Sequence, residues 1–193
     1  MTRRAEVREE TTRAIHEAAR AELREHGPRE LSLRNVARRV GMSPAGLYRY
    51  VDGRDGMLTG LIAESLYELA AAVGAAIESE PDRLEQVVAG FMAYRDWSVA
   101  HPAEFNLCFG EPIPGYAAPE GGPTNEAFRA VFAPLLGVLA AANASGLVES
   151  PELPEALTPL RMVSEVMMPD APPGLVTLAF ETHSPAAVLE RVL

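Results

Sequence analysis

The segment from residue 31 to residue 51, LSLRNVARRVGMSPAGLYRYV, contains two short helical patterns separated by a tight turn. Ser32 precedes the first pattern, where a hydroxyl can accept a hydrogen bond from a free backbone N–H. Gly41 follows it, where a chain leaving a helix often needs a positive φ. The apolar residues between them lie at i, i+3, i+4 and i+7, on one helical face: Leu33, Val36, Ala37 and Val40.

Ser43 and Pro44 mark the start of the second helix, which we predict over residues 44–50. Serine caps a helix, and proline at the first helical position has a suitable φ and no N–H to leave unpaired. Leu47 is expected to face the core. Two short helices joined by a turn of about 3–4 residues that contains glycine are typical of the helix-turn-helix, whose second helix enters the major groove of DNA.

The residue types around the second helix favour contact with DNA. Ala45 and Gly46 are small, which lets the backbone approach the bases. Tyrosine hydroxyls can donate hydrogen bonds to phosphate oxygens, and arginines can neutralise phosphate charge. The alternative is a plain helical hairpin whose tyrosines belong to the core. The predicted DNA-binding residues are Ser32, Arg34, Ser43, Pro44, Ala45, Gly46, Tyr48, Arg49, Tyr50 and Arg54.

Over roughly residues 8–62, this pattern resembles the TetR family of bacterial transcriptional repressors. Arg54 stands where the family usually has lysine, Val51 replaces the usual phenylalanine, and Gly56 replaces a usual acidic residue. The resemblance implies an all-α fold. A three-helix DNA-binding domain would span residues 1–53, and a helical effector-binding and dimerisation domain would span residues 54–193. The residues that carry the resemblance are Val36-Ala37, Gly41, Ser43-Pro44 and Leu47-Tyr48-Arg49-Tyr50.

The basic residues, all of them arginine, are concentrated in the part of the chain that contains the motif. Residues 1–60 contain 12 Arg and 9 Asp or Glu, a net charge of +3. Residues 61–193 contain 5 Arg and 18 Asp or Glu, a net charge of −13, and the two parts sum to the −10 of the whole chain. We therefore expect the N-terminal part to face DNA and the acidic remainder to face away from it.

Apolar spacing and the positions of proline and glycine predict the remaining helices. They span residues 6–26, 54–78, 82–100, 103–109, 124–144, 154–168 and 174–183. Arg3 and Arg4 are expected in an arm before the first helix, reaching DNA or frayed in solvent. Residues 111–123, with four prolines and three glycines, predict a loop. The helix over 82–100 is predicted to bury one side, made of Leu84, Val87, Val88, Phe91 and Tyr94.

A helical body with large side chains is suited to enclose a small molecule, and the family resemblance implies a pocket there. Each candidate residue, taken singly, is better explained as ordinary core. Cys108 fits either a redox sensor or a buried apolar filler. The predicted ligand-binding residues are Phe91, Tyr94, Trp97, Phe105, Cys108, Phe109, Phe128, Phe132 and Met162.

One helix-turn-helix reads only a few base pairs, so we expect a homodimer on a palindromic operator in double-stranded DNA, with recognition helices about 34–36 Å apart. The expected function is a sequence-specific transcriptional regulator, a repressor released by a small-molecule effector. The alternative is a ligand-independent regulator whose body serves dimerisation or protein contacts. The predicted dimer interface comprises Leu157, Leu160, Val163, Val166, Met167, Leu175, Leu178 and Ala179.

The sequence offers no pattern for catalysis or metal binding. Its four histidines are scattered, and no nucleophile and base stand at a recognisable spacing. We therefore expect no enzyme, no cofactor and no metal. The single cysteine rules out an intramolecular disulfide. The charged N-terminus does not resemble a signal peptide, and no apolar run approaches the roughly 20 residues that span a bilayer, so we expect a cytoplasmic protein without membrane contact.

Overall fold

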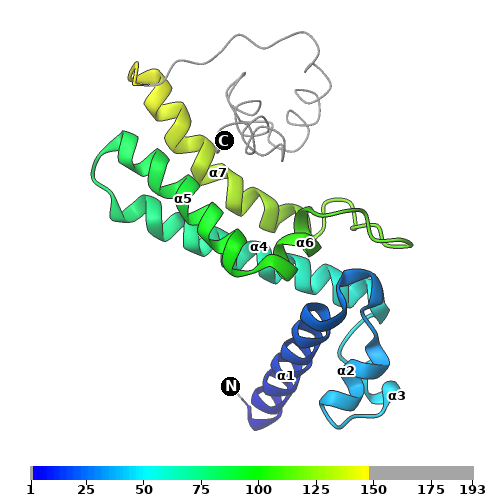
Figure 1. Cartoon of the computed structure of the whole chain (residues 1–193). Helices are drawn as coiled ribbons and strands as arrows, with labels where there is room; N and C mark the ends of the chain where they lie inside the picture. The colour runs from blue at the N-terminus through cyan, green and yellow to red at the C-terminus, as the bar shows by residue number, and fades with distance from the viewer. Residues whose placement is uncertain (1, 148–193) are drawn as a thin grey trace. The chain divides into compact units, whose positions relative to one another are not determined.

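The computed structural model describes residues 2–147, and these residues form an all-α structure without strands. The helices are α1 (Arg3–His26), η1 (Pro28–Glu30), α2 (Leu33–Arg39), α3 (Pro44–Leu47), α4 (Gly53–Ser79), α5 (Arg83–Ala100), α6 (Pro102–Phe109) and α7 (Pro123–Ala144) (Figure 1). The predicted helices over 154–168 and 174–183, Met162 and the predicted dimer interface lie outside the described residues.

The described chain divides into two compact units. The first runs to Glu68 and includes Trp97–Ala127, and the second contains Leu69–Asp96 and the described residues from Phe128 onward. Helices α4, α5 and α7 each contribute to both units. The predicted functional division at residue 53 remains a prediction.

In the first unit, α1 packs against α2 and α2 packs against α3. Ala19 of α1 and Ala37 of α2 are fully buried. Such small residues permit a close approach of helix axes. Leu47 is the buried residue of α3, as the sequence predicts. Other fully buried apolar residues of this core include Ile15, Leu23, Val36, Met57, Leu58 and Leu61.

The predicted helix starts are confirmed by their caps. The Ser32 hydroxyl accepts a hydrogen bond from the backbone N–H of Asn35, and the Ser43 hydroxyl accepts one from Gly46. Gly41 adopts a φ of 67°, the left-handed conformation that the turn between α2 and α3 requires. In the second unit, the Asp82 carboxylate accepts hydrogen bonds from the first free N–H groups of α5.

Two helix boundaries differ from prediction by three residues, and the others within the described residues by at most one. Helix α1 begins at Arg3, so Arg3 and Arg4 lie in its first turn and not in a separate arm. Helix α3 ends at Leu47 and not at Tyr50, because the hydrogen bonding changes from the α-helical to the 3₁₀ pattern. The backbone N–H of Tyr50 donates to Leu47 at 2.9 Å, and residues 48–50 form a turn.

The buried face of α5 matches the predicted one only in part. Val87 and Tyr94 are buried, but Leu84 and Val88 are 44% and 56% exposed. The buried face passes through Gly90, where an added Cβ would lie 2.9 Å from side-chain atoms of both Ile77 and Leu135. The close approach of α5 to these neighbours therefore selects the stripe through Gly90, and the larger apolar residues beside it remain outside.

Helices α4 and α7 contain stretches long and apolar enough by composition to cross a membrane, with mean hydropathies of 1.4 and 1.3, contrary to our reading of the sequence. Both helices also supply core residues. Leu61 in the first unit, and Leu69 and Leu139 in the second, are at most 2% exposed. Because buried helices of globular domains pass the same test, these stretches are explained as core helices.

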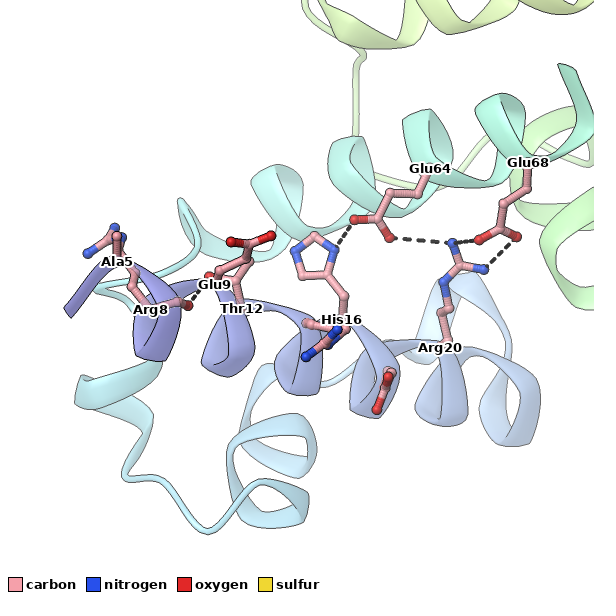
Figure 2. Close-up of a pocket in the computed structure, with 10 residues that line it drawn as sticks. Ala5, Arg8, Glu9, Thr12, His16, Arg20, Glu64 and Glu68 are labelled. Atoms are coloured by element: carbon pink, nitrogen blue, oxygen red, sulfur yellow. Dashed lines mark hydrogen bonds and ion pairs between the residues drawn. The ribbon is translucent and has the colours of Figure 1, made fainter. Parts of the chain in front are cut away.

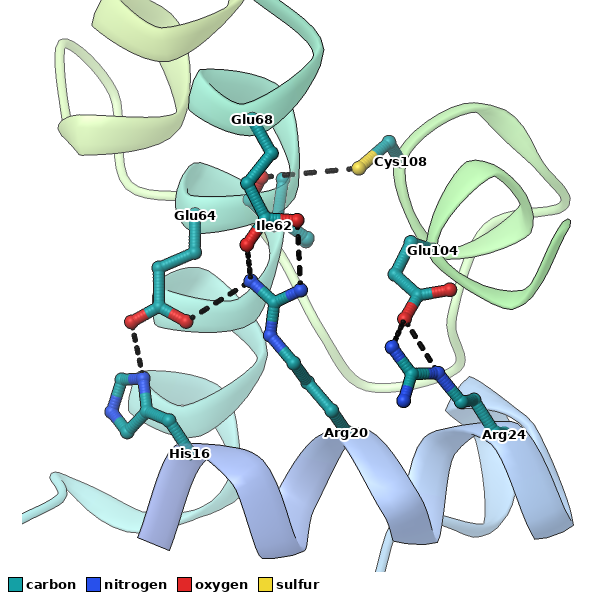
Figure 3. Close-up of polar contacts among 8 residues, drawn as sticks. All are labelled: His16, Arg20, Arg24, Ile62, Glu64, Glu68, Glu104 and Cys108. Atoms are coloured by element: carbon teal, nitrogen blue, oxygen red, sulfur yellow. Dashed lines mark hydrogen bonds and ion pairs between the residues drawn. The ribbon is translucent and has the colours of Figure 1, made fainter. Parts of the chain in front are cut away.

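One polar face of α1 is a feature that sequence reasoning missed. His16, Arg20 and Arg24 follow one another at i, i+4 and i+8 and therefore lie on one side of the helix. Figure 3 shows them directed toward glutamates of α4 and α6. Arg24 donates to the carboxylate of Glu104, which is 1% exposed, through Nε at 2.8 Å and through a second nitrogen at 2.6 Å.

The loop predicted over 111–123 is present as residues 110–122, and it is attached to the first unit. Ile113 is buried, and the hydroxyl of Tyr116 lies 3.0 Å from that of Thr59 in α4. Glu111 forms an ion pair with Arg29 at 2.6 Å. An apolar anchor and two polar contacts therefore hold the proline-rich segment against η1 and α4.

Replacing Arg24 by alanine should lower the free energy of unfolding by roughly 2–4 kcal/mol, because it leaves a carboxylate buried without its cation. Urea denaturation measures the change. The control is Arg29→Ala, whose partner Glu111 has an 82% exposed side chain. This exposed pair should contribute less than about 1 kcal/mol. Equal losses in the two variants would contradict the special role of the buried pair.

Candidate nucleic-acid interface

The outer surface of α3 and the turn after it is polar and open to solvent. Ser43, Pro44, Ala45 and Arg49 are exposed, and the side chain of Tyr48 is 60% exposed. Leu47, fully buried, holds this surface from beneath. The exposure of Tyr48 is inconsistent with the alternative in which the tyrosines form the core of a plain hairpin, whereas Tyr50 is half-buried.

The small residues and cap of α3 create the approach surface that the sequence predicts. Ser43 accepts from the N–H of Gly46 through its hydroxyl, at 3.1 Å, so this hydroxyl already has a structural role. An added Cβ at Gly46 would lie 3.3 Å from that same oxygen. Glycine at position 46 therefore leaves the Ser43 cap undistorted. Because Gly46 and Ala45 both have small side chains, the backbone of α3 is accessible beside them.

Helix α2 adds three exposed arginines to the same unit, of which Arg39 is paired with glutamates of α1. Arg34 and Arg38 are exposed, and Arg38 donates to the Asn35 side chain at 3.2 Å. Ser32, also predicted to bind DNA, is half-buried and caps α2 through its hydroxyl. Its role in DNA binding remains a prediction, beside a structural role that the hydrogen bond shows.

Arg54, predicted to bind DNA, makes contacts within the protein, and its role in DNA binding remains a prediction. Its guanidinium donates to the carbonyl oxygens of Pro28 at 2.9 Å, Arg29 at 3.0 Å and Leu31 at 3.3 Å. These carbonyls lie in and just after η1, where helical hydrogen bonding leaves acceptors free. Arg54 therefore joins the start of α4 to the connection between α1 and α2, a use that its charge and position in the sequence do not reveal.

Helix α1 also contacts the turn after α3, at residues 48–50. The guanidinium carbon of Arg8 lies 5.4 Å from the centroid of the Tyr50 ring, and an N–H of Arg8 donates to the carbonyl oxygen of Arg49 at 3.4 Å. The sequence prediction did not include Arg8. Its separation of 41 residues from Arg49 gives no local signal that the two meet.

A buried carboxylate joins α1 and α2. Glu22 is fully buried and accepts a hydrogen bond from the Asn35 amide at 2.6 Å and one from Arg39 at 3.3 Å. Arg39 also bonds Glu25, and this hydrogen bond lowers the pKa of the Glu25 carboxyl. Glu22, Glu25 and His26 cluster closely enough to suggest a cation site, but Arg39 already supplies the positive charge there.

An open groove of about 720 Å³ follows α1 and α4 (Figure 2). Its charged groups are largely paired with one another. Arg20 lies 2.7 Å from Glu68 and 3.4 Å from Glu64, and His16 also bonds Glu64. Burial raises the pKa of Glu64, but the bond from His16 and the charge of Arg20 outweigh it and lower this pKa overall. None of the predicted ligand-binding residues lines this groove.

The eight predicted ligand-binding residues within the described chain are divided between the two units. In the second unit, the ring of Phe132 lies 6.1 Å from Tyr94 and 4.5 Å from Phe128, and Phe91 packs against the neighbouring core. In the first unit, Phe105 and Phe109 are 5.0 Å apart, and Trp97 stacks on His101 at 4.8 Å. Their role in ligand binding remains a prediction.

Cys108 is half-buried, and its surroundings favour the filler interpretation over the redox sensor. Its sulfur lies 3.8 Å from the carbonyl oxygen of Ile62 (Figure 3). Burial and the nearby charge of Glu104 raise the pKa of the thiol to about 12. Because the thiolate is the form that reacts with oxidants, this environment disfavours the redox-sensor interpretation.

The Arg54→Ala variant should lose about 2 kcal/mol of unfolding free energy, since three carbonyl oxygens lose a charged donor. Arg54→Lys should recover only part of this, because a lysine ammonium cannot reproduce the planar set of donors. The exposed Arg34→Ala exchange is the control and should change stability by less than about 0.5 kcal/mol. Equal stability of Arg54→Ala and wild type in urea would show that the carbonyl contacts are dispensable.

The Cys108 thiol should react with a disulfide reagent at pH 8 much more slowly in the folded protein than in the unfolded one, because its raised pKa leaves little thiolate. The native pKa exceeds the unfolded value of about 8.5, so stability is fully present below about pH 8.5 and declines as pH rises toward 12. Absorbance of the released thiolate follows the reaction, with urea-unfolded protein as the control. Reaction of the folded protein as fast as that of the unfolded protein would contradict the filler interpretation of Cys108.

Comparison with known proteins covers both parts of the chain. Residues 15–61 match the family model of bacterial regulatory proteins, tetR family, and residues 87–183 match that of the tetracyclin repressor-like C-terminal domain. The HTH-type transcriptional regulator Rv1816 of Mycobacterium tuberculosis (strain ATCC 25618 / H37Rv) is 37% identical over 146 residues, 75% of this chain. The chain spans 62% of the length of that relative.

Solved structures agree in fold. The crystal structure of the regulatory protein SCO4313 is 26% identical, with a TM-score of 0.64 over 99% of this chain and 96% of that one. A TetR family transcription regulator from Marinobacter aquaeolei VT8, 19% identical, shares the fold with a TM-score of 0.62 over 94% and 86% of the two chains. Together with the two family models, these similarities show that the chain belongs to the TetR family of bacterial regulatory proteins.

Proposed function

We propose that this protein is a cytoplasmic, homodimeric transcriptional regulator that binds a palindromic operator through α3 and the turn after it. The observation that carries the proposal is the exposed surface of residues 43–49 above the buried Leu47. Small residues at its start permit close approach to bases, and Tyr48 and Arg49 supply a hydroxyl donor and a positive charge for phosphates. The relatives are named as HTH-type transcriptional regulators, and none of these names denotes an enzyme.

A dimer is proposed because of the size of this surface. A four-residue α3 reaches few base pairs, and affinity for one operator normally requires two such helices about 34–36 Å apart. The net charge of −13 over residues 61–193 supports an arrangement in which the rest of each protomer stays away from the phosphates. Sedimentation velocity at several concentrations tests the dimer independently of DNA.

Repression with release by a small molecule is the finer part of the proposal. An effector acts by binding the form with low DNA affinity more tightly, and about 1–3 kcal/mol of coupling is typical. Each unit contains aromatic side chains that could line an effector site. The alternative, a ligand-independent regulator, predicts that no small molecule raises the unfolding temperature while also weakening operator binding.

The first experiment is selection of duplexes from a random DNA pool by the purified protein, followed by titration at several salt concentrations. Specific binding that protects a palindrome and weakens steeply with salt supports the dimeric regulator. Failure to enrich any sequence at low and at physiological salt would refute the proposed DNA-binding function.

Two substitutions on the recognition surface should act differently on the selected duplex. Arg49→Ala should weaken binding, because a phosphate-neutralising charge is lost. The salt slope, which is the slope of log affinity against log salt concentration, should fall by about 1 for the DNA-binding part (head) of each protomer. Tyr48→Phe should weaken binding about three- to tenfold with an unchanged slope, because only a neutral hydrogen bond is lost. Filter binding or fluorescence anisotropy measures both quantities.

The thermal stability of both variants should equal that of wild type, since both side chains are exposed. Wild-type affinity in both variants would exclude this surface as the DNA-binding site. The same loss of affinity accompanied by loss of folding would invalidate the comparison of slopes, and circular dichroism therefore accompanies each titration.

A further inference from the structure

The turn at residues 48–50 receives little support from its own helix. α3 is four residues long, and its last α-type hydrogen bonds are long, with 3.4 Å from the N–H of Tyr48 to Pro44 and 3.3 Å from Val51 to Leu47. Leu47 is its only fully buried side chain. The 2.9 Å bond from the N–H of Tyr50 to Leu47 is the one short backbone bond that residues 48–50 donate, so a further contact from outside α3 would help to keep the side chains of this turn in one position.

We propose that Arg8 of α1 is a positioning residue for DNA recognition, which fixes the turn that carries Tyr48, Arg49 and Tyr50. Its guanidinium faces the Tyr50 ring at 5.4 Å and also donates to the carbonyl oxygen of Arg49 at 3.4 Å. One side chain therefore touches a ring and a backbone acceptor on adjacent residues. The inference rests on the proposed DNA-binding function, but the contact itself does not.

Arginine is suited to this dual contact. The planar guanidinium can present its face to an aromatic ring while its N–H groups point along the edge toward a carbonyl oxygen. A lysine carries the same charge but cannot make both contacts in one geometry. Exchange of Arg8 for lysine therefore separates a positioning role from simple attraction of phosphates.

The first test is independent of DNA. Hydrogen exchange followed by mass spectrometry should show that the amides of residues 48–51 exchange about three- to tenfold faster in Arg8→Lys, while those of α2 are unchanged. The control, Arg4→Lys, makes the same exchange one turn earlier on α1 and should leave both segments unchanged. Unchanged exchange of residues 48–51 in Arg8→Lys would overturn the proposal.

The second test uses the duplex that wild-type protein selects. Arg8→Lys should weaken specific binding about tenfold, a loss of about threefold per head multiplied over two heads, with the salt slope unchanged. Tyr50→Leu should weaken binding at least as much, because Tyr50 is itself a predicted DNA-binding residue. The free-energy loss in the double variant should be smaller than the sum of the two single losses, since the two substitutions share the contact between Arg8 and the Tyr50 ring. Binding to a scrambled duplex should not change in any variant.

The outcomes separate the two proposals. Full affinity in Arg8→Lys, or additive losses in the double variant, would show that Arg8 does not position the turn. Absence of any selected duplex for wild-type protein would refute the DNA-binding function, and the exchange rates would still decide whether Arg8 holds the turn.

Discussion

Glu22 of α1 is a fully buried carboxylate, and it accepts hydrogen bonds from Asn35 and Arg39 of α2. A buried charge without partners is costly, so the two helices gain most stability in the arrangement that brings these donors to it. Apolar packing of Ala19 and Ala37 tolerates small rotations of one helix on the other, whereas hydrogen bonds have narrow geometry. The position of α2, and of α3 packed against it, depends on this carboxylate.

Other side chains of α1 also join this helix to its neighbours through polar contacts. Arg20 and Arg24 bind glutamates of α4 and α6, and Arg8 contacts the turn after α3. α1 therefore makes polar contacts with α2, α4, α6 and the turn after α3. Arg54 adds a connection at the opposite side, from the start of α4 to the carbonyl oxygens around η1. Most of these contacts join residues more than 20 positions apart in sequence.

These internal contacts change how the basic charge of the N-terminal part is interpreted. The excess of +3 over residues 1–60 agrees with DNA binding, but several of these arginines neutralise glutamates of the protein itself. Arg8, Arg34, Arg38 and Arg49 are exposed, and under the proposed function they are the candidates to contact phosphates. A paired arginine releases few counterions on DNA, so the footprint is smaller than the count of arginines suggests.

Local physics determined the helix-turn-helix. Caps by Ser32 and Ser43, the positive φ of Gly41 and the burial of Leu47 all follow from residues within a few positions of one another, and each agrees with the prediction. Tertiary structure alone decided the rest. The buried stripe of α5 runs past Leu84 and Val88 because neighbours approach Gly90, and Arg54 binds carbonyl oxygens because η1 ends beside it. Spacing along a chain gives the faces of a helix, but the partner of each face depends on distant residues, and so does the use of each charge.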